Sequence, residues 1–455
     1  MENTKQGSLT EGPILKVLTK LALPIMASAF LGTAYNLTDM AWIGMLGSKA
    51  VAGVGVGGMF IWFSQGLSTL ARMGGQVHVG QSLGRGDRED AKEYVLAALQ
   101  LCVIFAVLYG AFCLIFTDQL IGFFGLTDPE TIGYAKIYLQ ITCGLIIFSY
   151  ITAVLTGLYT AQGDSKTPLK ANTAGLILNM ILNPILIFGI GPFPKLGVVG
   201  AAIATVFAQV VASVSMIWMV MKSKTNTNLL KEVSFCRVAK MRHVKAIVRL
   251  GFPTAVQTMI YCGISMMLTR MVTGFGEAAV ATFRVGGQIE SLSWNTADGF
   301  AAAMNAFSAQ NYGAGKIDRV KKGYRISAVT IAAWGTLIGL AFLLFPEPIS
   351  RIFFHEAHVI PVSVQYLMIV GISEPFMCVE LMAIGAISGL GNTKICSIIS
   401  ILLTGLRIPL AMILGSTFLG LAGIWWALTL TSVAKGIVFH FTFYRQCSKK
   451  EARLR

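Results

Sequence analysis

The sequence predicts an all-α integral membrane protein with about twelve transmembrane helices, arranged in two pseudo-symmetric lobes of six helices each. Three observations support this fold class. The 455 residues are 55% hydrophobic and only 13% charged, whereas soluble domains contain about 25% charged residues. Apolar runs recur along the whole chain, and roughly 20 apolar residues of helix match a hydrocarbon core of about 30 Å. The second half of the chain also repeats motifs of the first half.

The apolar runs and the polar breaks between them place the spans in order. The spans are expected to begin near residues 14, 51, 94, 132, 171, 198, 250, 278, 324, 363, 395 and 420. An even number of spans puts both termini on one side of the membrane. If that side is the cytoplasm, 27 of the 36 Lys and Arg residues fall in inner segments and only four in outer connections. The positive-inside rule therefore predicts a multi-pass protein of the cell membrane with both termini cytoplasmic.

The net charge and the cysteines argue against several other classes of protein. The formal charge of +15 is divided among many loops, where it faces anionic lipid headgroups, so membrane lipids are expected partners and nucleic acid is not. The eight cysteines are scattered without a Cys-x-x-Cys pair, which indicates neither a disulfide framework nor a zinc site. The sequence shows no clustered nucleophile, base or metal set, so we expect neither enzymatic activity nor a cofactor.

A displacement of 229 residues aligns the two halves of the chain. It superposes GSKAVAGVGVGG, from Gly47, on GEAAVATFRVGG, from Gly276, and QSLGRGDREDAK on QNYGAGKIDRVK. Each half holds an even number of spans, so both halves enter the membrane with the same orientation. The lobes are expected at residues 1–225 and 250–455, joined by a cytoplasmic linker at 226–249. Parallel repeats of this kind are typical of secondary transporters, although duplicated helical bundles also occur in channels and enzymes.

Asp39 is a carboxylate in a segment that is otherwise apolar enough to cross a membrane. No charged side chain stands between Leu21 and Asp39, and an intramembrane acid costs several kcal/mol unless it is paired, wetted or protonated. Tyr35 lies one helical turn before Asp39, and Asn36 lies three residues away. A phenol, an amide and the acid are therefore expected along one cavity wall. The alternative is that Asp39 lies at the outer interface, in contact with headgroup water.

Two amides on the fifth expected span are candidates to meet Asp39. Asn179 and Asn183, in LILNMILNPILIFG, are four residues apart and so lie on one face of a helix. Together with Asp39 they are a candidate Na⁺ site built from carboxylate and amide oxygens, and Asp39 by itself is a candidate proton carrier. The alternative is that these polar side chains only join neighbouring helices.

The second half of the chain carries most of the remaining intramembrane charges. Four acids there are candidates to line a substrate cavity: Glu290, Asp298, Glu374 and Glu380. Buried ion pairs are the alternative, for example between Arg284 and Glu290. The displacement of 229 residues aligns Asp39 with Leu268, so the first-span acid is not part of the repeated framework.

These motifs resemble the multidrug and toxic compound extrusion (MATE) family over essentially the whole chain. The resemblance lies in Leu-x-x-Pro opening both lobes, YNLTDMAWIGMLG in the first span, AQGDSKTP after the fourth, and LNMILNPILIFGIGPFPKLGVVGAAIAT across the fifth and sixth. SAQNYGAGK and SGLGNTK occupy the corresponding places in the second lobe. The resemblance implies an antiporter that expels amphipathic, often cationic, organic compounds in exchange for H⁺ or Na⁺, by rocking of two lobes.

The resemblance also assigns roles to residues of the first span. Asp39 and Tyr35 match the family's first-span acid and the tyrosine one turn before it. Pro24 matches the proline near the start of the same helix and is expected to act as a hinge. Asp39 is thereby implied to be the residue that couples ion and substrate movement.

Further matches lie in the fifth and sixth spans, and departures lie in the second and fifth. Asn179 and Asn183 match an Asn-x-x-x-Asp motif of many members, and Thr205 matches a sixth-span threonine. Asn183 is a departure from the family pattern, because an amide replaces the second acid. Arg72 and His78 in the second span are also atypical of the family.

A second transport function, the flipping of lipid-linked sugar precursors, shares the broad architecture. A cavity that binds pyrophosphate would need intramembrane cations, and Arg270, Arg284 and Arg407 are the available candidates. For either function we expect a monomer.

Overall fold

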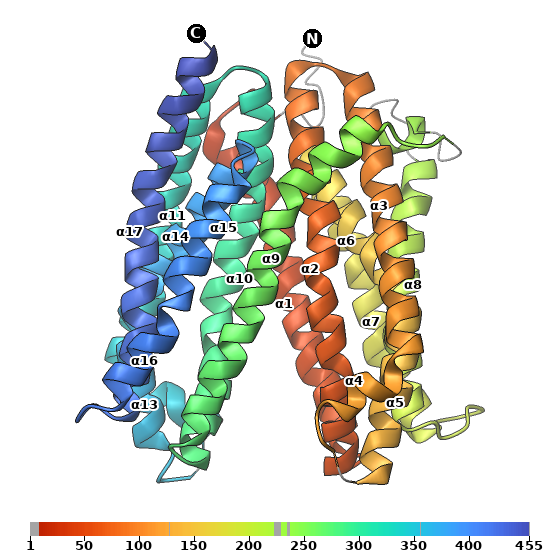
Figure 1. The fold of residues 1–455 in the computed structure, drawn as a ribbon, viewed down its shortest axis with the longest axis vertical. Coiled ribbons are helices and arrows are strands. Elements are labelled where there is room, and N and C mark those ends of the chain that lie inside the picture. The colour runs from red at the N-terminus through yellow and green to blue at the C-terminus, as the bar shows by residue number, and fades with distance from the viewer. Residues whose placement is uncertain (1–8, 127, 223–228, 234–236, 355, 455) are drawn as a thin grey trace. The chain divides into compact units, whose positions relative to one another are not determined.

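The computed structural model describes residues 9–126, 128–222, 229–233, 237–354 and 356–454 (Figure 1). Within these residues the regular secondary structure is helical and contains no strand. The first eight residues and parts of the predicted linker at 226–249 lie outside the described residues.

The helices follow the order that the apolar runs predict. The first half of the chain forms α1 (Ile14–Gly44), α2 (Ser48–Arg85), α3 (Arg88–Ile115), α4 (Thr117–Gly122), α5 (Pro129–Gly144), α6 (Ile147–Ala161), α7 (Lys166–Phe188), α8 (Val198–Lys222) and a 3₁₀ turn, η1 (Leu229–Glu232). The second half forms α9 (Met241–Thr273), α10 (Glu277–Gly313), α11 (Ile317–Leu344), α12 (Pro346–Phe353), α13 (Ile360–Gly371), α14 (Glu374–Gly389), α15 (Thr393–Gly405), α16 (Arg407–Gly415) and α17 (Leu421–Leu454). Helices α2 and α10 begin 229 residues apart, as do α3 and α11, which is the displacement of the sequence repeat.

The number of membrane-spanning helices agrees with the prediction. By length and composition, nine of the described helices are able to cross a membrane, counting α15 with α16 as one. Two bent helix pairs, α5 with α6 and α13 with α14, raise the number to as many as eleven. Helix α10 is 37 residues long and more polar, and it occupies the place of the remaining expected span. The all-α fold class with about twelve spans is therefore confirmed.

Three of the expected spans are each divided into two helices. The axes of α5 and α6 differ by 47° and those of α13 and α14 by 50°, while α15 ends just before α16 begins. Pro375 and Pro409 stand in the first turns of α14 and α16, and proline lacks the N–H that would continue the preceding helix. Each pair occupies the place of one predicted span, and the structure adds a break within it.

The chain divides into two compact units, whose boundary differs from that of the predicted lobes. Among the described residues, unit 1 holds those between Ala27 and Ala255, and unit 2 holds Leu9–Met26 and those from Val256 onward. The first part of α1 groups with unit 2 because Leu18 is fully buried in the same apolar cluster as Phe307 of α10. The predicted lobes instead assigned the whole of the first span to the first lobe.

Glycines allow the helices of unit 1 to approach closely. A Cβ atom on Gly175 of α7 would lie 2.6 Å from the backbone oxygen of Ala208 in α8. In the GVGVGG run of α2, a Cβ on Gly57 would lie 3.0 Å from the backbone oxygen of Ala135 in α5. Close packing of this kind drives helix association in membranes, where lipid is as apolar as the side chains. This run therefore packs helices together.

Unit 2 is built around α10, α11, α14 and α17. Phe307, Met382 and Phe439 are fully buried in its apolar core. A Cβ on Gly385 of α14 would lie 2.3 Å from the backbone oxygen of Ala301 in α10. These contacts fix the helices that carry the intramembrane acids of the second half.

Gly251→Ala in α9 is expected to destabilise the protein. A Cβ at this position would lie 2.1 Å from the backbone oxygen of Leu70 in α2, and overpacking of a core typically costs about 1–3 kcal/mol. Thermal unfolding in detergent should show a lower midpoint than the wild type. Gly263→Ala in the same helix is the matched control, because nothing lies within 4 Å of its added Cβ. Equal effects of the two substitutions would contradict this packing account.

Candidate functional site

Asp39 of α1 accepts a hydrogen bond from Asn183 of α7. The Asn183 Nδ2 atom lies 2.6 Å from Asp39 Oδ1 and 2.7 Å from Asn179 Oδ1. Both asparagines are at most 1% exposed, whereas Asp39 is partly exposed. The structure thus brings together three of the candidate residues, Asp39, Asn179 and Asn183, which are called the Asp39 cluster below.

The Asp39 cluster contains one amide oxygen and one amide nitrogen without hydrogen-bond partners among the described residues. Asn183 Oδ1 and Asn179 Nδ2 are buried and have no hydrogen-bond partner among the described residues. Unpaired buried polar atoms typically cost about 1–3 kcal/mol each. Hard cations prefer carboxylate and amide oxygens of this kind. Because the described residues contain no group of three or more His, Cys, Asp or Glu that could hold a metal, a cation here would depend on the two amides.

Tyr35 and Thr205 lie next to each other, whereas Asn36 lies apart. The Tyr35 hydroxyl is 3.4 Å from Thr205 Oγ1 of α8, which links the first span to the sixth. Asn36 is exposed, and its side chain forms no hydrogen bond with the described residues. On a helix Asn36 lies about 100° around the axis from Tyr35 and about 60° from Asp39, at the edge of the face that carries the other two. The structure therefore does not place Asn36 in the site.

Pro24 is buried within α1, which continues through it as a single helix. Because proline has no backbone N–H, the carbonyl group of Lys20, one turn before Pro24, lacks its usual helical hydrogen-bond donor. Pro24 lies in the part of α1 that groups with unit 2. Its role as a hinge stays a prediction.

A cavity of about 280 Å³ lies inside unit 1 and shares Tyr35 and Thr205 with the candidate site. Helices α1, α2, α6, α7 and α8 contribute to its wall. Its lining residues are Ser28, Gly32, Tyr35, Gln65, Arg72, Ser149, Thr152, Ala153, Thr156, Asn172, Gly175, Leu176, Thr205, Ala208, Gln209 and Ala212. Most of these side chains are polar, one is cationic, and none of these described residues is acidic.

The buried-pair alternative holds for Glu380 of α14. Its Oε1 atom lies 2.9 Å from Lys435 Nζ of α17, and both side chains are only 7% exposed. A buried pair of this kind is costly to break, because the remaining charge has no compensation. Glu380 is therefore already neutralised within unit 2.

The other three acids of the second half have different surroundings. Glu290 of α10 accepts a hydrogen bond from the Tyr366 hydroxyl of α13, while Arg284 is exposed. The suggested pairing of Arg284 with Glu290 was therefore wrong, and a phenol takes the place of the guanidinium. Glu374 is 1% exposed, and its Oε2 atom has no hydrogen-bond partner among the described residues. Asp298 is exposed.

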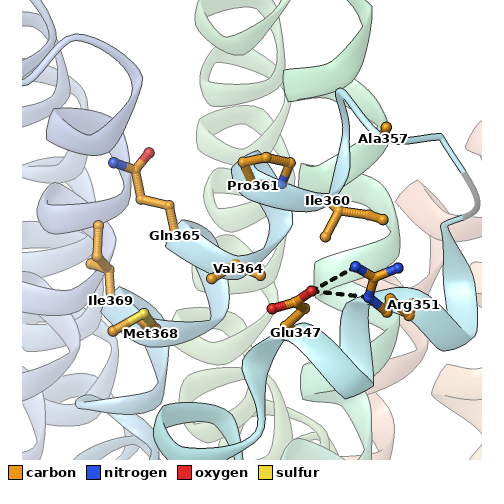
Figure 2. Close-up of a pocket in the computed structure, with 9 residues that line it drawn as sticks. All are labelled: Glu347, Arg351, Ala357, Ile360, Pro361, Val364, Gln365, Met368 and Ile369. Atoms are coloured by element: carbon orange, nitrogen blue, oxygen red, sulfur yellow. Dashed lines mark hydrogen bonds and ion pairs between the residues drawn. The ribbon is translucent and has the colours of Figure 1, made fainter.

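A larger hollow of about 730 Å³ lies beside α12 and α13 of unit 2 (Figure 2). Its two charged residues neutralise each other, since Arg351 Nη2 lies 2.7 Å from Glu347 Oε1. Figure 2 shows this pair together with the mostly apolar residues that surround it, such as Ile360 and Met368. The hollow contains none of the candidate site residues and no uncompensated charge among the described residues that line it.

Some contacts could not be found by inspecting the sequence. The partners Tyr366 and Lys435 stand far along the chain from the acids that they contact, and the only signal was a polar group within an apolar run. His78, which is atypical of the family, lies with its Nε2 atom 3.3 Å from the Ala246 carbonyl oxygen and stacks on Tyr94. These contacts explain His78 as part of the packing of α2 against α3 and α9.

Comparison with known proteins gives consistent results over the whole chain. The MatE family model matches residues 24–185 and 253–413, once in each half. A probable multidrug resistance protein NorM of Thermotoga maritima is 30% identical over 90% of this chain and 88% of its own length. An FAD transporter of Shewanella oneidensis is 26% identical over 98% of this chain and 97% of its own length. The crystal structure of MATE in the bent conformation has the same fold, with a TM-score of 0.91 at 22% identity and full coverage of both chains.

Lys435→Met is expected to lower stability strongly because it leaves Glu380 buried without a counter-charge. Removal of one partner of a buried pair typically costs about 3–5 kcal/mol. Thermal unfolding in detergent should show this loss, and the double variant Lys435→Met/Glu380→Met should recover most of it. A double variant no more stable than the single one would contradict a mainly structural role for the pair.

Proposed function

The chain belongs to the multidrug and toxic compound extrusion (MATE) family of membrane transporters, and we propose that it exports amphipathic, often cationic, organic compounds in exchange for H⁺ or Na⁺. Relatives named as multidrug resistance proteins support efflux of such compounds. The relative named as an FAD transporter means that family membership alone does not restrict the substrate to drugs.

The hydrogen-bonded Asp39 cluster is the observation that carries this proposal. Asp39 is the acid of the first span, and Asn183 donates to it at 2.6 Å. In this arrangement the carboxylate acts as an acceptor, which suits its ionised form. Removal from water favours the neutral acid, whereas the hydrogen bond from Asn183 favours the ionised form.

The same amide is able to serve the protonated state. A neutral Asp39 has an O–H to donate, and Asn183 Oδ1 is a buried acceptor without a partner among the described residues. Rotation of the Asn183 amide would therefore exchange donor for acceptor as the proton arrives. For Na⁺, the same oxygen would join those of Asp39 and Asn179 as a ligand. Either cation would change the hydrogen bonding between α1 and α7.

Cation and substrate would be exchanged by competition for one negative group. A cationic compound near Asp39 is favoured when the acid is ionised and disfavoured when a proton or Na⁺ neutralises it. Transport requires in addition that each ligand binds the inward-open and outward-open states with different affinity, since only differential affinity shifts such an equilibrium. Pro24, inside α1, is the proposed hinge of that change.

Flipping of lipid-linked sugars is less well supported. The cations that would form a pyrophosphate site are not gathered in the structure: Arg270 and Arg284 are exposed, while Arg407 donates to Thr431 Oγ1 at 3.0 Å and to Ser432 Oγ at 2.9 Å. Arg407 is thus occupied by hydroxyl groups of α17.

The setting of the proposed activity follows from the membrane-spanning fold. We place the protein in the cell membrane with both termini in the cytoplasm, on the distribution of Lys and Arg. We propose that a monomer is the transporting form, because the Asp39 cluster is formed entirely within unit 1.

Asp39→Asn is expected to abolish gradient-driven export. The amide keeps the size of the side chain but has no charge to bind a proton or Na⁺. The measurement uses purified protein in proteoliposomes with a pH gradient or a Na⁺ gradient. The wild type should export a cationic dye, and Asp39→Asn should not. The matched control is Asp118→Asn, because Asp118 forms an exposed ion pair with Lys136 at 2.6 Å.

The choice of gradient identifies the coupling ion. Export under the pH gradient alone would assign H⁺, and export under the Na⁺ gradient alone would assign Na⁺. Undiminished coupled export by Asp39→Asn under either gradient would overturn the assignment of Asp39 as the coupling residue.

A further inference from the structure

Arg72 is an uncompensated cation in the wall of the cavity inside unit 1. It lies on α2 and lines the cavity of about 280 Å³. It forms no ion pair with any acid among the described residues, and none of the described lining residues is acidic. An arginine stays charged at any physiological pH. A charge at membrane depth is expensive unless it meets water or a counter-charge.

The packing of α2 against α6 holds the stem of Arg72 in place. A Cβ on Gly157 of α6 would lie 2.8 Å from Arg72 Cγ, so only a glycine leaves room for the arginine side chain at its present position. A positioned guanidinium loses less conformational freedom on binding a ligand than a free one. The arrangement therefore favours recognition of a ligand by Arg72.

The polar groups around Arg72 can complete a site for an anion. Thr152 Oγ1 of α6 is buried, lines the cavity and has no hydrogen-bond partner among the described residues. Gln65, Asn172 and Gln209 add amide donors to the wall. A guanidinium binds a carboxylate through two parallel hydrogen bonds, and neutral donors support the same oxygens. The volume is close to the lower end of ligand pockets, about 300 Å³.

We propose that this cavity binds the carboxylate end of amphipathic organic compounds through Arg72, so that zwitterions and organic anions are substrates beside cations. The inference rests on the proposed function of export. The cavity shares Tyr35 with the coupling helix, one turn from Asp39. A zwitterion would then place its anionic end at Arg72 and its cationic end toward Asp39.

A pair of dyes tests the proposal by equilibrium binding in detergent without any gradient. Rhodamine 110 carries a free carboxylate, and rhodamine 123 is its methyl ester. Charge-assisted hydrogen bonds to Arg72 should make wild-type protein bind rhodamine 110 about tenfold more tightly by fluorescence polarisation. Arg72→Gln should remove this preference, and Arg72→Lys should keep part of it.

Two further variants guard against effects on folding. Thr152→Val removes a hydroxyl that is unpaired in the structure, so it should fold, and it should reduce the preference for rhodamine 110 several-fold. Arg351→Gln breaks only an exposed pair outside this cavity and should leave the preference unchanged.

Three results would overturn the proposal. The first is equal affinity of the wild type for both dyes, and the second is an equal loss of affinity for both dyes in Arg72→Gln. The third is an Arg72→Gln variant that keeps the preference for rhodamine 110 and loses only bound phosphatidylglycerol, as seen by native mass spectrometry. The last would assign Arg72 to a lipid phosphate. Because no gradient is used, failure of Asp39-dependent export would leave this result unaffected.

Discussion

The bilayer interior offers no water, so each polar or charged group within it must find its partner in the protein. Unit 2 meets this constraint for several of its charged groups with side chains of its own. Lys435 neutralises Glu380, hydroxyl groups of α17 bind Arg407, and a phenol donates to Glu290. These contacts join α14 and α16 to α17, and α10 to α13, so Glu290, Glu380, Arg407 and Lys435 serve the fold.

In unit 1 the constraint is unmet at the candidate site and in the cavity beside it. Asn183 Oδ1 and Thr152 Oγ1 lack partners among the described residues, and Arg72 lacks a counter-charge there. Unit 1 therefore holds an acid, Asp39, and a cation, Arg72, at membrane depth, and the two do not form an ion pair. Such groups are costly in a resting protein and useful in one that must bind ions and substrates reversibly. The acid of the first span has no counterpart in the second half, because the repeat aligns Asp39 with Leu268.

Features that depend on local pattern were predictable from the sequence. The spans follow from apolar length, the repeat fixes the spacing of α2 and α10, and a four-residue spacing places Asn179 and Asn183 on one face. Features that depend on long-range packing were not. The grouping of Leu9–Met26 with unit 2 and the hydrogen bond of Glu290 with Tyr366, where the sequence suggested Arg284, depend on neighbouring helices. Asn36 stays a prediction, because its three-residue spacing from Asp39 suits neighbouring side chains while its own side chain is exposed.

Asp39 is the group proposed to exchange a cation for substrate. The most direct measurement is the release of that cation when rhodamine 123 binds to purified protein in weakly buffered detergent, followed with a pH indicator and a sodium-selective electrode. We expect the wild type to release H⁺ or Na⁺ on binding the dye, and Asp39→Asn to release neither. Release of the same amount by Asp39→Asn would contradict the account.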